Sequence, residues 1–142
     1  MRYWMLMLAL LGLLIATAAQ AAPSLTASSD RAKWAVNDTG IFTVTMAVPA
    51  ADAATIAAPT ITLPVPAGWQ ATSASGKGPR VIQNTATATW TGGSVSSNPV
   101  SFRVQGATLA ASVGSSSVTL AVADGVEPGE TVTLTVALKR VS

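Results

Sequence analysis

Two similar alternating runs, one near each end of the chain, most constrain what this sequence can fold into. The first extends from Val36 to Val48 and the second from Val126 to Leu138, and in each a turn signal precedes alternating Thr and aliphatic residues. Aligned without a gap, the apolar positions are Phe42, Val44, Met46 and Val48, and Val132, Leu134, Val136 and Leu138. This period of two is typical of a half-buried strand. We therefore expect two equivalent strands that pack into one core from neighbouring positions.

Other short runs between Gly, Pro, Asn and Ser signals predict further strands, and no segment after the N-terminal stretch has a sustained helical period. The clearest are a leading strand near Leu25 and the runs 60–65, 69–73, 85–91, 99–104 and 117–122. The prolines around 60–65 favour an edge strand or a strand end, and 50–58 is expected to be a loop. The spacing predicts an all-β sandwich or barrel of about seven to nine strands.

The middle of the chain carries more specific expectations. The run that begins at Trp69 is expected to stop in a flexible loop at Gly76-Lys77-Gly78-Pro79. The alternating run T-A-T-A-T-W-T is expected to turn Ala86, Ala88 and Trp90 toward the core. Gly106 is expected to end the strand that follows.

The first 21 residues are typical of an export signal. Arg2 is followed by the apolar stretch Met5 to Ile15 and by Ala19-Gln20-Ala21, so cleavage is expected after Ala21. The apolar stretch is shorter than the roughly 20 residues of a spanning helix, and no membrane span is expected after processing. Residues 22–142 then form a single domain of an exported protein that is periplasmic, at the cell surface or secreted.

Composition excludes several classes of function. The chain has no Cys and no His, which removes disulfides, thiolate metal sites, His-dependent zinc chemistry and triad hydrolysis. Without Arg2, seven basic residues face six acidic ones, a net charge of +1 with no basic cluster for nucleic acid. We expect no cofactor.

The acidic residues were weighed as calcium ligands and as catalytic groups. Asp124, Glu127 and Glu130 lie within one short segment, but Pro128-Gly129 between them favours a solvated turn over a calcium loop. Asp30, Asp38 and Asp52 fall in loops without an aromatic-lined acidic cleft. The sequence therefore predicts no metal site, no catalytic residues and no enzyme.

Three tryptophans remain after processing, Trp34, Trp69 and Trp90. Each can fill the core, which the strand pattern favours, or stack on a sugar ring. Trp69 follows a Gly turn and is the first candidate for exposure. Trp69 and Trp90 are the candidate ligand-binding residues.

The segments L-P-V-P-A-G-W-Q-A-T-S-A-S (63–75), T-W-T-G-G (89–93) and the closing V-T-L strand together resemble immunoglobulin-like repeat domains of bacterial and archaeal surface proteins. The chain departs from these repeats in having one copy and in lacking the Asn-Gly turn that commonly follows their first strand. The resemblance implies an extracytoplasmic β-sandwich for structure or adhesion, with no catalytic residues.

The expected function is that of a structural or interaction module, in adhesion, at the cell surface or in a filament. Its expected partners are other envelope or surface proteins, or further copies joined through sheet edges, with the polar leader 23–35 as a donated strand. The alternative is a carbohydrate-binding module that holds a polysaccharide on Trp69 and Trp90.

Overall fold

The computed structural model describes residues 23–51 and 54–142, so the expected signal peptide lies outside the described residues. The described part contains ten strands and no helix, which confirms the all-β prediction, although the count exceeds the expected seven to nine. The strands are β1 (Ser24–Ser29), β2 (Thr39–Ala47), β3 (Thr60–Pro64), β4 (Trp69–Asn84), β5 (Thr87–Trp90), β6 (Gly93–Ser96), β7 (Val100–Leu109), β8 (Ala111–Val113), β9 (Ser117–Ala121) and β10 (Thr131–Arg140).

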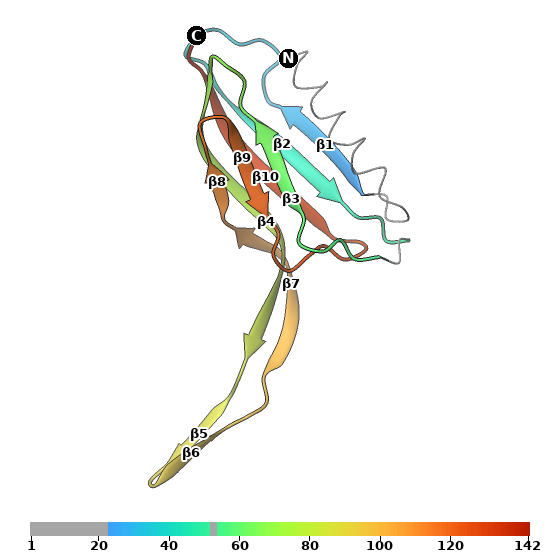
Figure 1. Cartoon of the computed structure of the whole chain (residues 1–142), viewed down its shortest axis with the longest axis vertical. Coiled ribbons are helices and arrows are strands. Elements are labelled where there is room, and N and C mark those ends of the chain that lie inside the picture. The colour runs from blue at the N-terminus through green and yellow to red at the C-terminus, as the bar shows by residue number, and fades with distance from the viewer. Residues whose placement is uncertain (1–22, 52–53) are drawn as a thin grey trace.

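The strands form two larger antiparallel sheets and one separate ribbon. The five-stranded sheet has the order β1-β2-β10-β4-β7, the three-stranded sheet the order β3-β9-β8, and β5 pairs only with β6. Figure 1 shows the two larger sheets as one body and the β5–β6 ribbon far from it. β3 is an edge strand, as its prolines predict.

The core lies between the two larger sheets, in a sandwich-like arrangement. The five-stranded sheet supplies the buried residues Phe42, Val44, Met46, Val132, Leu134, Val136 and Leu138. The facing sheet supplies Ile61, Leu63, Val118 and Leu120. The threonines that alternate with them, such as Thr45 and Thr133, are more exposed. Period-two alternation therefore separates an apolar inner face from a Thr-rich outer face.

The two matching runs become adjacent strands at the centre of the larger sheet, as predicted. β2 and β10 pair antiparallel, with Met46 opposite Val132, Val44 opposite Leu134 and Phe42 opposite Val136. Because the strands run in opposite directions, only the central matched residues, Val44 and Leu134, lie opposite each other, and the other matched residues pair with different partners. Both apolar faces enter the same core.

The expected flexible loop at Gly76 to Pro79 is wrong, because β4 runs through it. A Cβ on Gly76 would lie 2.5 Å from Leu120 Cδ1, and one on Gly78 would lie 2.9 Å from Leu109 Cδ1. Gly76 therefore permits close packing of β4 on the opposite sheet, and Gly78 permits close packing against side chains of the neighbouring strands β7 and β10. Pro79 is fully buried at a register shift between β4 and β7, where its missing N–H interrupts no regular ladder.

The expected inward face at Ala86, Ala88 and Trp90 is also wrong, since all three are exposed. The strand that was expected to end at Gly106 continues to Leu109, with Gly106 at a φ of 65°. As a result, β4 and β7 form one long hairpin whose far part leaves the body of the molecule (Figure 1). We call residues Val81 to Phe102 the arm.

The polar leader is already paired within its own chain. All six residues of β1 pair with β2, from Ser24 opposite Ala47 to Ser29 opposite Phe42. In this structure β1 of the leader is therefore an intramolecular edge strand of the five-stranded sheet. No helix in the described part of the chain is long and apolar enough to span a bilayer.

Candidate interaction surface

The arm is a two-stranded ribbon with every residue exposed. β4 pairs with β10 only as far as Lys77, and beyond that point its pairing is with β7. Ile82 lies opposite Phe102 near the base of the arm, and Ala88 lies opposite Val95 near its tip. A lone two-stranded ribbon is marginally stable in water. The arm therefore gains little stability from the core of its own chain.

The arm exposes several large apolar side chains among polar ones, and none of its residues is charged. Trp90 is 57% exposed, Val95 58% and Phe102 48%, and Val81, Ile82 and Val100 are also exposed. The polar positions carry Thr, Ser, Asn and Gln. An exposed apolar patch of this kind on a soluble domain marks an interaction site.

A two-residue turn closes the tip of the arm. Trp90 pairs with Gly93 across Thr91 and Gly92, and Gly92 has a φ of 105°, which only glycine adopts without strain. A Cβ on Gly93 would lie 3.1 Å from Trp90 Cζ2, so the indole covers this glycine. The T-W-T-G-G segment thus presents a tryptophan at the outermost point of the molecule.

An ion-pair cluster fixes the base of the arm to the body. Arg103 on β7 donates to both carboxylate oxygens of Glu130, from Nε and Nη2, each at 2.7 Å. Its Nη1 and Nη2 also donate to the carbonyls of Asp124 and Gly125. Gln105 Nε2 and the Glu127 backbone N–H donate to the same carboxylate. β7 and the connection before β10 are therefore held together at one point.

Glu130 is 6% exposed. Its carboxyl group loses its proton at a pH well below the usual range for glutamate, because its pKa is lowered. The hydrogen bond from Arg103 is the largest cause that lowers the pKa of Glu130 from 4.5 to about 2, against the opposing effect of burial. The hydrogen bonds from Gln105 and the Glu127 backbone and the charge of Arg103 add to it. The same hydrogen bond raises the pKa of Arg103. A bidentate, charge-assisted pair of this kind sets the orientation of both side chains.

The three acids considered as calcium ligands, Asp124, Glu127 and Glu130, have other partners in or near this cluster. Glu130 is directed at Arg103, while Asp124 Oδ2 accepts the N–H of Val81 at 2.9 Å. Glu127 is half exposed, 3.5 Å from Arg103 Nε. Within the described residues, no group of three or more acidic residues is arranged to hold a metal ion.

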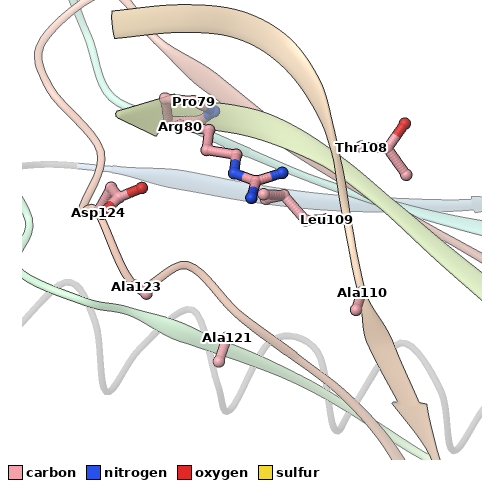
Figure 2. A pocket seen from close by; sticks show the side chains of 8 residues that line it. All are labelled: Pro79, Arg80, Thr108, Leu109, Ala110, Ala121, Ala123 and Asp124. Atoms are coloured by element: carbon pink, nitrogen blue, oxygen red, sulfur yellow. The ribbon is translucent and has the colours of Figure 1, made fainter. Parts of the chain in front are cut away.

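A shallow cleft of about 600 Å³ lies beside the base of the arm, between β4, the end of β7 and the segment after β9. Figure 2 shows Arg80 extending from β4, Asp124 on the turn after β9, and small alanine side chains along the remaining wall. Its lining residues are Pro79, Arg80, Thr108, Leu109, Ala110, Ala121, Ala123 and Asp124. One cation and one carboxylate that already accepts a backbone N–H do not form a nucleophile–base pair.

The other two tryptophans lie at the opposite end of β4. Trp69 and Trp34 pack edge to face with centroids 4.7 Å apart, and both contact the core. With Arg140, Pro66 and small neighbours they line a cleft of about 410 Å³. Arg140 is held by the carbonyls of Trp34 and Ser142. Trp69 is thus half-buried, and Trp90, not Trp69, is the more exposed of the two candidate residues.

Two of the three acids considered as catalytic groups, Asp30 and Asp38, make contacts near the connection between β1 and β2. Asp30 accepts the N–H of Ile41, and Asp38 accepts the N–H of Ala35 and pairs with Arg31 at 3.3 Å. Asp52 lies outside the described residues. The two described acids therefore order the connection between β1 and β2.

The sequence reasoning missed the arm as a unit, and with it Val95, Phe102 and the Arg103–Glu130 pair. The segment from Val81 to Phe102 has no Asp, Glu, Lys or Arg, but the segments 53–76 and 104–123 have none either, so the absence of charge did not single out the arm. In the sequence, Arg103 is only a polar residue next to Phe102. Its ion-pair partner Glu130 lies 27 residues away, so local sequence does not reveal the pair.

Comparison with models of protein families, with curated proteins and with solved structures gives no match.

Proposed function

We propose that this chain is an exported, non-catalytic β-sandwich of the immunoglobulin-like kind that acts as a structural or interaction module. It would work in the periplasm, at the cell surface or outside the cell. The body is the scaffold, and the arm is the element that meets a partner, such as another envelope or surface protein or a component of a filament.

The observation that carries the proposal is the uncharged, fully exposed arm. Keeping Trp90, Val95 and Phe102 in water is unfavourable, because burial of a large apolar side chain is worth roughly 1.5–3 kcal/mol. The Arg103–Glu130 pair supports the same role, since it holds the base of the arm in one orientation. A fixed apolar projection lowers the ordering cost of binding.

The test is retention of the purified mature chain on envelopes isolated from its native cells. We expect Phe102→Glu to reduce retention at least fivefold, because a carboxylate would then enter a desolvated contact. Val113→Glu is the matched control, since Val113 is 44% exposed but lies on β8, away from the arm. Equal retention of wild type, Phe102→Glu and Val113→Glu would reject the proposal.

A carbohydrate-binding module is the second candidate, favoured by the exposure of Trp90 and by the cleft that Trp34, Trp69 and Arg140 line. Tryptophan faces stack on sugar rings. Affinity electrophoresis in polysaccharide gels tests it with Trp69→Ala and Trp90→Ala. Retardation that either substitution abolishes supports this function, and migration of both variants like wild type removes it.

Export is tested separately. The N-terminal sequence of the protein purified from its native cells is expected to begin at Ala22. A protein that still begins at Met1 would contradict the signal peptide.

A further inference from the structure

We propose that the partner of the arm is the same arm of a second copy of this chain, which makes the mature protein a dimer. This inference rests on the proposed function, because it names the partner of the surface described there. The arguments are the open edges of the arm, its lack of charge and the apolar area that it exposes.

Both edges of the arm are open to another strand. β7 is the last strand of its sheet, and no described strand pairs with β4 beyond Lys77 on the side opposite β7. Exposed edges are normally protected by charged side chains, proline or bulges. Pro99 is the one proline between Val81 and Phe102, and no charged residue is present there. Strand addition along this edge therefore meets little obstruction.

Because the arm has no charge, a second uncharged arm suits it better than a charged partner does. No ionisable side chain lies between Val81 and Phe102, so two identical arms approach without repulsion and bury no charge. Arg103 at the base is already neutralised by Glu130. An acidic or basic partner would find no complementary group along the arm.

The exposed apolar area is of the size that a small dimer needs. With roughly 150–250 Å² for each whole side chain, the exposed fractions of the apolar residues give on the order of 500 Å² per arm. Two arms bring together on the order of 1,000 Å², near the lower bound of about 1,200 Å² for specific interfaces, before any backbone area is added. An arm-to-arm contact is isologous and closes at two copies.

The test is the mass of residues 22–142 in solution, by sedimentation velocity across a concentration series. We expect a dimer for wild type and for the control Val113→Lys. The paired double variants Ala88→Lys/Val95→Lys and Ala88→Glu/Val95→Glu are each expected to raise the dimer dissociation constant at least tenfold. In about 10 mM salt, where the Debye length is about 30 Å, an equimolar mixture of the two is expected to form mixed dimers. Circular dichroism checks that both variants fold.

Restored association in the mixture identifies an arm-to-arm contact, because an arm that bound elsewhere on the second copy would not be rescued. Wild type that stays monomeric, or dimers that both double variants leave intact, would overturn the inference. A monomer whose tryptophan emission shifts to the blue with phosphatidylcholine vesicles, a shift that Trp90→Phe abolishes, would also overturn it, in favour of a lipid surface. A monomer that loses envelope retention on Phe102→Glu would overturn this inference and leave the proposed function standing.

Discussion

At the scale of single residues, Glu130 makes the most consequential polar contact of the chain. It accepts two hydrogen bonds from Arg103, and the side chain of Arg103 is only 18% exposed. Removing one partner of such a pair leaves the other desolvated without compensation.

We therefore expect Glu130→Gln to lower the free energy of unfolding by about 2–4 kcal/mol, since Arg103 would lose its bidentate partner and keep only the half-exposed Glu127 as a counter-charge. Glu127→Gln is the matched control, because Glu127 is half exposed and its loss should cost less than about 1 kcal/mol. Urea denaturation of both variants measures the difference. Equal stability of the two variants would contradict this role of Glu130.

The depressed pKa of Glu130 also predicts a pH dependence. Its pKa is about 2 in the folded state and 4.5 ordinarily, so folding favours the ionised carboxylate. The stabilisation is complete above about pH 4.5 and is lost as pH falls toward 2, by on the order of 3 kcal/mol in total. We expect the stability difference between wild type and Glu130→Gln to shrink across this range. A difference that stays constant from pH 6 to pH 2.5 would refute the assignment.

At the scale of elements, β4 determines how the molecule is built. Its first half pairs with β10 in the body, and its second half forms one side of the arm. At Gly76 the opposite sheet approaches too closely for a side chain, and at Gly78 the side chains of Leu109 and Val132 leave no room for one.

Gly76→Ala should therefore lower the free energy of unfolding by about 1–3 kcal/mol, because its new methyl group would overlap the side chain of Leu120. Ser75→Ala, at the exposed neighbouring position, is the control and should change stability by less than about 0.5 kcal/mol. Thermal unfolding followed by circular dichroism distinguishes them. If Gly76→Ala proved as stable as wild type, the close approach of the two sheets would be wrong.

At the scale of the whole molecule, the body and the arm depend on each other only at the base of the arm. The buried core residues lie in the body, and the residues of the arm are exposed. The body should therefore fold without the arm.

Replacing residues 84–100 by Asn-Gly joins the paired residues Gln83 and Ser101 through a two-residue hairpin turn and keeps Arg103. We expect a folded protein whose unfolding free energy lies within about 1 kcal/mol of wild type, because a shorter connection lowers the loop-closure cost only slightly. Urea denaturation measures it. Loss of the cooperative transition would contradict the independence of the body.

The sequence by itself determined which side chains share a face of each strand. The alternation in β2 and β10 identified the core residues from Phe42 to Val48 and from Val132 to Leu138. It did so because successive side chains in a strand point to opposite sides, a property that is local to the strand.

Only the tertiary structure decided what each face meets. Val100 and Phe102 alternate as regularly as Val132 and Leu134, yet the first two are exposed, since no second sheet covers the arm. Arg103 and Glu130 likewise form a pair only when β7 and the turn before β10 come together. Burial and pairing depend on segments far apart in the chain, and strand periodicity carries no information about them.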